Sequence, residues 1–168
     1  MKNNIVLIGM PGVGKSTIGV ILAKELGYDF VDADLVIQKK TGKLLKDIIA
    51  TEGIDGFRRI ENEVNASLEV QHSVIATGGS VIYGKEAMEH LSMIGEIVYL
   101  KLDLPHLEKR LGNLKCRGVV IRDDQTLADL MNERTPLYEK YAQYIIDEEG
   151  KDIEGTLEEL LVTLQSHE

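Results

Sequence analysis

A nine-residue stretch near the amino terminus has the residue types of a phosphate-binding loop. Residues 9–17 read GMPGVGKST, which matches the pattern G-x-x-x-x-G-K-[ST] at Gly9, Gly14, Lys15 and Ser16. An apolar run precedes the stretch and an amphipathic segment follows it, as expected for a strand and a helix. Glycines let backbone N–H groups converge on phosphate oxygens, and a helix N-terminus favours negative charge. The stretch therefore predicts binding of a nucleoside triphosphate.

The same loop indicates which groups would meet the nucleotide. Lys15 can reach the β- and γ-phosphates, and the Ser16 hydroxyl can ligate Mg²⁺. A glycine-rich turn without a ligand is the alternative interpretation, but the complete pattern between a strand and a helix disfavours it. We expect ATP contacts from five residues of this loop: Gly12, Gly14, Lys15, Ser16 and Thr17.

Polar and glycine residues follow two further apolar runs. Asp32 and Asp34, in FVDADLV, would lie at the carboxyl end of a strand, which is where ligands bind in open parallel sheets. One carboxylate could support the metal, and the other could orient a substrate hydroxyl and accept its proton. Alternatively, Asp34 only caps the helix that begins beside it. The glycine pair in TGGS (77–80) would let backbone N–H groups approach a ligand.

Two adjacent arginines, Arg58 and Arg59, stand in the stretch DGFRRIENE of a chain whose net charge is −9. The planar guanidinium group matches a carboxylate in a bidentate manner. The two side chains could bind a ligand anion, or they could pair only with Glu61 and Glu63 on their own helix.

Further arginines gather in the second half of the chain. Arg110, Arg117 and Arg122 lie in or beside residues 112–125, a stretch with glycines and no clear periodicity. Mobile arginines over a phosphate loop suit charge stabilisation during phosphoryl transfer, whereas solvated surface charges are the alternative. Arg134, in NERTPLYEKY, offers a second basic site on a helix.

These residues are distributed over short apolar runs that alternate with helical patterns. The pattern predicts one domain, residues 1–168, with a three-layer α/β/α fold around a five-stranded parallel sheet. The predicted strands are 5–8, 30–31, 73–76, 97–100 and 144–146. The predicted helices are 15–26, 35–40, 44–51, 53–69 and 85–92, with three more that start near 105, 126 and 156.

The composition excludes several classes of partner. With 19 basic and 28 acidic residues, the chain offers no clustered positive charge for nucleic acid or for a membrane surface. Its single cysteine, Cys116, allows no intrachain disulfide. The four apolar residues before Gly9 are too few for a signal peptide. We expect a cytoplasmic protein that binds small molecules, with a monomer as the default state.

The motifs in this order resemble the shikimate kinase family, a group of P-loop proteins related to nucleoside-monophosphate kinases. The resemblance rests on GMPGVGKST, DADLVIQKKTG, FRRIE, TGGS and RTPLY, and it covers nearly the whole sequence. It implies ATP-dependent phosphorylation of the 3-hydroxyl of shikimate, in aromatic amino-acid biosynthesis. It also implies a substrate-binding insertion over residues 33–70 and a short lid over residues 112–125.

On the acceptor side, the resemblance assigns a role to four residues. Asp34 would hold the hydroxyls beside the transferred phosphate, Arg58 and Arg134 would bind the carboxylate, and Gly79 would give a backbone N–H. Arg59 is rotated by about 100° around the helix from Arg58, so we expect it on the surface.

On the nucleotide side, the resemblance implies that Lys15 and Arg117 steady the moving phosphoryl group. Together with Asp34, they would form the catalytic set. Ser16 and Asp32 would serve Mg²⁺, and Arg110 would lie near the adenine.

Three positions depart from the family pattern: Ser80 stands where a third glycine is usual, Gly118 replaces a proline of the lid, and Ile49 stands where an aromatic residue is common. Two alternative functions therefore stay open. One is a kinase of another hydroxylated carboxylic acid, such as a gluconate-like substrate. The other is an ATP-binding regulatory domain without chemistry.

Overall fold

Five parallel strands form the centre of the molecule. The computed structural model describes residues 2–112 and 119–167. The strands lie in the order β2-β3-β1-β4-β5, and every neighbouring pair is parallel. Their bounds are β1 Asn4–Ile8, β2 Asp29–Asp32, β3 Ser73–Ala76, β4 Gly95–Lys101 and β5 Tyr144–Asp147. The predicted five-stranded sheet is confirmed, because each apolar run of the sequence became one strand.

The central strand carries the phosphate loop. All five residues of β1 are buried, because helices cover both faces of the sheet. Its neighbours are held in register by pairs such as Ile5 with Val74 and Leu7 with Val98. The loop after β1 therefore emerges at the middle of the carboxyl edge, between the ends of β3 and β4.

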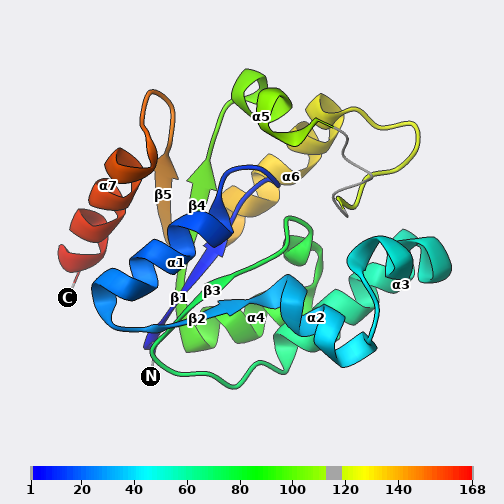
Figure 1. Ribbon diagram of the computed structural model, residues 1–168, viewed down its shortest axis with the longest axis horizontal. Helices are drawn as coiled ribbons and strands as arrows, with labels where there is room; N and C mark the ends of the chain where they lie inside the picture. Colours follow the sequence, from blue (N-terminus) through cyan, green and yellow to red (C-terminus); the bar gives the residue numbers. More distant parts are fainter. Residues whose placement is uncertain (1, 113–118, 168) are drawn as a thin grey trace.

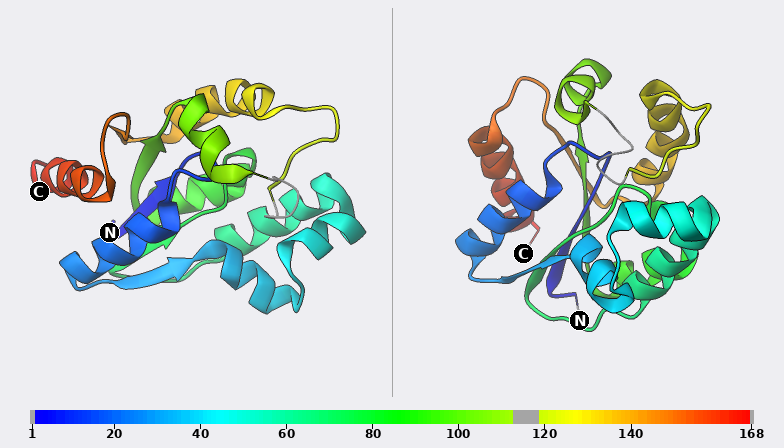
Figure 2. Two further views of the ribbon diagram at one scale, coloured as in Figure 1. Left: turned by 45° about the horizontal axis from the view of Figure 1, so that its top comes forward. Right: turned by 45° about the vertical axis from the view of Figure 1, so that its right-hand side comes forward.

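Seven α-helices surround the sheet in the described ranges. Helices α1 and α7 pack side by side on one face, and α4 and α6 lie on the other, as both views of Figure 2 show. Figure 1 shows that α2 and α3 extend beyond β2 on one side of the molecule. The bounds are α1 Lys15–Leu26, α2 Ala33–Thr41, α3 Leu45–Ala66, α4 Lys85–Ile94, α5 Leu104–Leu111, α6 Leu127–Tyr141 and α7 Ile153–Gln165. The three-layer prediction is confirmed.

Helices α2 and α3 connect β2 to β3 and have a small core of their own. The two helices predicted at 44–51 and 53–69 are the halves of α3, which is interrupted at Gly53 (φ 73°). Phe57 is buried in this second core with Ile48 and with Val120 from the later segment. A substrate-binding role for 33–70 stays a prediction, but this insertion is structurally distinct from the main core.

One predicted helix start is wrong. The last helix begins at Ile153 and not near Thr156, because the Asp152 carboxylate caps it by accepting a hydrogen bond from the N–H of Gly155 (2.7 Å). No helix among residues 2–112 and 119–167 is long and apolar enough to cross a membrane.

Candidate active site

The loop between β1 and α1 has the backbone that the sequence pattern requires. Gly9, Gly12 and Gly14 all have positive φ, at 150°, 90° and 90°. A side chain at Gly9 would approach the carbonyl oxygen of Leu100 to 2.5 Å, so only glycine fits there. The loop leads directly into the amino end of α1, and a glycine-rich turn followed by a helix N-terminus is the arrangement that binds phosphate.

Lys15 is folded against this loop. Its ammonium group donates hydrogen bonds to the carbonyl oxygens of Gly9 (2.7 Å) and Met10 (2.9 Å). Burial lowers the pKa of Lys15 to about 8, against the attraction of Asp34 and other nearby carboxylates. The ammonium group is therefore held over the loop, close enough to Asp34 for the two charges to attract each other.

Ser16 and Asp32 are brought together as the sequence predicts. The Ser16 hydroxyl donates to Oδ2 of Asp32 over 3.2 Å, although the two residues belong to different elements. The other oxygen of Asp32 accepts from the N–H groups of Asp34 and Leu35 and so caps α2. One hydroxyl and one carboxylate beside a phosphate loop suit Mg²⁺, which prefers few protein oxygens, water and phosphate. In the described parts of the chain, no group of three or more His, Cys, Asp or Glu could hold a metal without such additional ligands.

Asp34 is not the helix cap, since Asp32 has that role. Its carboxylate lines a pocket with Gly79 and Arg134. Burial and the nearby charge of Asp32 raise the pKa of Asp34 to about 6, while Lys15 opposes the rise. A carboxylate in this state accepts a hydrogen bond from a hydroxyl and can take up its proton near neutral pH.

Helix α6 contributes two residues to the same pocket. Arg134 is only 1% exposed, and its guanidinium donates to the carbonyl oxygen of Val120 (2.8 Å). One turn later, the Tyr138 hydroxyl donates to the carbonyl oxygen of Gly79 (2.6 Å) and so fixes this peptide. A side chain at Gly79 would approach Arg134 to 2.9 Å. The predicted residues Gly79 and Arg134 are therefore neighbours, and Tyr138 orients one of them.

Arg58 lies on the inner side of α3 and Arg59 on the outer side. Arg58 is half-buried, and its guanidinium lies 3.8 Å from the centre of the Tyr83 ring. Arg134 lies 5.6 Å from the same ring. Arg59 is exposed, as expected, and no ion pair in the described ranges joins either arginine of α3 to a glutamate. The two cations that the family resemblance assigns to one carboxylate therefore lie near the same tyrosine ring.

A second carboxylate reaches the pocket from α3. Glu61 is 2% exposed, and one of its oxygens accepts a hydrogen bond from the Ser80 hydroxyl. Its other oxygen, Oε2, has no hydrogen-bond partner. Burial raises the pKa of Glu61 to about 7, against the effect of the Ser80 hydrogen bond. A side chain at Gly78 would approach both Oε2 of Glu61 and Oδ1 of Asp34 to 2.7 Å, so the glycine lets two carboxylates line one pocket.

The residues predicted as a lid are only partly described. Val119 and Val120 are buried, and both line the same pocket as Asp34 and Arg134. Arg122 is exposed. Arg117 and Gly118 lie outside the described residues, so the roles assigned to them stay predictions. The apolar pair shows that the segment after Gly118 packs onto the insertion instead of standing in solvent.

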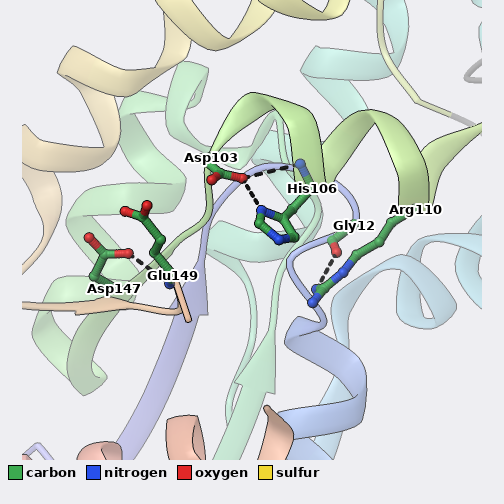
Figure 3. Close-up of polar contacts among 6 residues, drawn as sticks. All are labelled: Gly12, Asp103, His106, Arg110, Asp147 and Glu149. Carbon is green, nitrogen blue, oxygen red and sulfur yellow. Dashed lines mark hydrogen bonds and ion pairs between the residues drawn. The ribbon is translucent and has the colours of Figure 1, made fainter. Parts of the chain in front are cut away.

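Arg110 contacts the phosphate loop from α5. Its guanidinium donates to the carbonyl oxygen of Gly12 over 3.0 Å, as Figure 3 shows. Asp103 precedes the same helix, and its carboxylate caps the helix and also contacts the ring of His106. A pocket beside Arg110 is lined by Gly14, Thr17 and the segment that follows β5. Arg110 and three of the five predicted ATP contacts of the loop, Gly12, Gly14 and Thr17, therefore border one pocket, which Lys15 and Ser16 do not line.

Four residues of the site were not predicted from the sequence: Tyr83, Tyr138, Glu61 and Glu148. Tyr138 could have been found from its i,i+4 spacing to Arg134, which places both on one face of α6. Glu61 stands one turn after Arg58, but it was interpreted as a possible surface partner. Nothing local in the sequence indicates Tyr83, because only the fold brings it beside Arg58.

Comparisons with known proteins agree with this geometry. The family model described as shikimate kinase matches residues 11–165. A shikimate kinase of Alteromonas mediterranea is 40% identical over 163 residues, covering 95% of each chain. One of Francisella tularensis subsp. novicida is 39% identical over 161 residues, covering 94% of this chain and 92% of the relative.

Solved structures give the same result. The shikimate kinase from Acinetobacter baumannii in complex with shikimate superimposes with a TM-score of 0.89 at 33% identity, covering 100% of this chain and 96% of that one. The enzyme from Aquifex aeolicus gives 0.82 at 29% identity, with 98% and 97% covered. With a matching family model, a matching fold and relatives at about 40% identity, the chain belongs to the shikimate kinase family.

Proposed function

We propose that this protein is a phosphotransferase that moves the γ-phosphate of ATP to the 3-hydroxyl of shikimate, a step of aromatic amino-acid biosynthesis. The observation that carries the proposal is the acceptor pocket: Asp34 and buried Arg134 line it together, and Arg58 lies against the same tyrosine ring as Arg134. A hydroxylated carboxylic acid matches this set, since it offers one anion and several hydroxyl groups.

On the acceptor side, Arg58 and Arg134 bind the carboxylate of shikimate, and the N–H of Gly79 adds a hydrogen bond. The Nε atoms of both arginines are buried without a partner, so they have donors to offer. Asp34 then accepts a hydrogen bond from the 3-hydroxyl and takes its proton as the oxygen attacks phosphorus. Fixing the acid at both ends places this oxygen for in-line attack.

On the donor side, N–H groups from Gly12 to Thr17 hold the phosphates, and Lys15 moves from the loop carbonyls to the γ-phosphate. Ser16 and Asp32 would hold Mg²⁺, which neutralises charge on the phosphate oxygens when it is bound. Arg110 would lie along the nucleoside, and Arg117 would act from the lid. Phosphoryl transfer needs little else from the protein than this positioning and charge.

The two alternative functions predict other behaviour. A gluconate-like acceptor would use the same cations, but the relatives found are shikimate kinases. A regulatory ATP-binding domain would have no need for a buried Arg134 or for a carboxylate with a pKa near 6 opposite the phosphate loop. We further propose that the protein acts as a monomer in the cytoplasm, where ATP is available.

The test is an assay of ADP release with shikimate, quinate, gluconate and no acceptor, in the presence of Mg²⁺. We expect shikimate to accelerate release far above the blank. A rate that no acid changes would support the regulatory domain, and a rate that only gluconate changes would support the other kinase. Mass spectrometry of the product distinguishes phosphorylated acid from simple ATP hydrolysis.

A further inference from the structure

Glu148 is a buried carboxylate with no assigned task. It follows β5 directly, and its N–H donates to the carbonyl oxygen of Lys101 (2.9 Å), which fixes the backbone. The residue is 5% exposed, and its Oε2 atom has no hydrogen-bond partner. It lines the nucleotide pocket with Arg110 and Gly14. A buried polar atom without a partner is unfavourable, and this residue lines a pocket in which a ligand can supply the missing donor.

The nearby cations do not satisfy this carboxylate. Arg110 donates to the carbonyl of Gly12, and Lys15 donates to the carbonyls of the loop, so neither forms an ion pair with Glu148 among the described residues. Burial, together with the nearby negative charge of Asp147, raises the pKa of Glu148 to about 7. The positive charges of Arg110 and Lys15 oppose this rise but do not cancel it. Asp152, the other acid that lines this pocket, already caps α7.

The sheet order gives the direction in which the nucleotide lies. Asp34 follows β2, on one side of the phosphate loop, so the γ-phosphate of ATP must point that way. The nucleoside must then extend to the opposite side, over β4 and β5, where Glu148 lies. Arg110 and Ile153, which is 47% exposed, offer a cationic and an apolar wall for a flat base. A base held between these walls would present its edge to Glu148, which lines the same pocket.

We propose that the Glu148 carboxylate accepts a hydrogen bond from the 6-amino group of adenine and thereby selects adenine over 6-oxo purines. The inference rests on the proposed function, in that ATP is taken as the phosphoryl donor and Asp34 as the residue on the acceptor side, which sets the direction of the nucleotide. Ionised glutamate can only accept hydrogen bonds. A 6-oxo purine would place a second acceptor against it, which leaves two buried acceptors unpaired. A site that leaves a buried hydrogen-bonding group unpaired rejects the wrong base more strongly than a site that differs from it only in shape.

The experiment compares the binding of ADP and inosine diphosphate, which differ at position 6 of the base, by calorimetry at pH 8. The wild-type protein should bind ADP at least about tenfold more tightly, as expected when a buried acceptor loses its partner. In Glu148→Gln, the amide can accept or donate, so this preference should fall to about threefold or less. Glu149→Gln is the matched control, because this neighbour has the same charge but is exposed (Figure 3), and it should keep the wild-type preference.

Two results would overturn the inference. One is a wild-type protein that binds both nucleotides equally. The other is a Glu148→Gln variant that weakens both nucleotides by one factor and leaves their ratio unchanged, since this would place Glu148 against the ribose or the phosphates. The readout is binding alone, so it stands apart from the acceptor assay. A protein that binds ADP selectively but ignores shikimate would refute the proposed function and leave this inference intact.

Discussion

Glu61 should make the ligand-free protein less stable as the pH rises, and Glu61→Gln should remove this effect. Burial raises its pKa in the folded protein from 4.5 to about 7. Between these two values the folded state holds a proton that the unfolded state has released. The free energy of unfolding therefore falls as the pH rises from about 4.5 to about 7, and it stays reduced above that.

The size of the effect follows from the two pKa values. Each pH unit is worth about 1.4 kcal/mol, so their difference corresponds to about 3 kcal/mol at pH 8. Glutamine is nearly isosteric, carries no charge, and keeps an oxygen that can accept from the Ser80 hydroxyl. We expect Glu61→Gln to be more stable than the wild type by about 1–3 kcal/mol at pH 8, and by little at pH 5.

Urea denaturation at pH 5, 6.5 and 8 measures this difference, with the slope m compared to confirm two-state behaviour. Glu63→Gln is the control, because Glu63 lies on the same helix but is exposed. Ser80→Ala should have the opposite sign and lose about 1.5–3 kcal/mol at pH 8, since it removes the donor to a charged oxygen. A Glu61→Gln variant that is no more stable than the wild type at pH 8 would refute the reasoning.

Three further predictions concern activity. Arg58→Ala should raise KM for the acceptor about 10- to 150-fold and leave nucleotide affinity unchanged, because it removes one charge-assisted contact worth about 1.5–3 kcal/mol. Steady-state kinetics should show no such effect for Arg59→Ala. An unchanged KM in Arg58→Ala would show that Arg58 does not bind the acceptor. Lys15→Ala should abolish product formation in a mass-spectrometric assay, and retained transfer would contradict the role of the loop. The wild-type kcat/KM for the acceptor should decrease below about pH 6, because Asp34 becomes protonated there. Asp34→Asn should lose most of the activity, and its residual kcat/KM should no longer decrease at low pH. A decrease at low pH that remains in Asp34→Asn would show that another group causes it.

Much of the fold followed from local patterns. The apolar runs located all five strands, and the signal is clearest for β1 and β3, which are buried at every residue and therefore read as nearly continuous apolar runs. The start of α7 was missed, since the cap at Asp152 lies before the first periodic leucine. The 100° rotation between Arg58 and Arg59 correctly separated the inner side chain from the exposed one.

The candidate site was only partly predictable. Ser16 and Asp32 could be paired because motif and strand order place both at one edge. Tyr83 could not be found, since it meets Arg58 only through packing between α3 and the turn after β3. Glu148 has no motif, and its importance comes from burial, which a single sequence does not display.

The order of the strands divides the work of the protein between two halves. Most of the residues that would recognise the acceptor come from the β2–β3 side, and α6 and the Val119–Val120 pair complete that pocket, whereas the pocket proposed for the nucleoside lies on the β4–β5 side. Mutations that reshape one half therefore leave the other largely untouched. A scaffold arranged in this way can acquire a new acceptor during evolution while it continues to use the same phosphoryl donor.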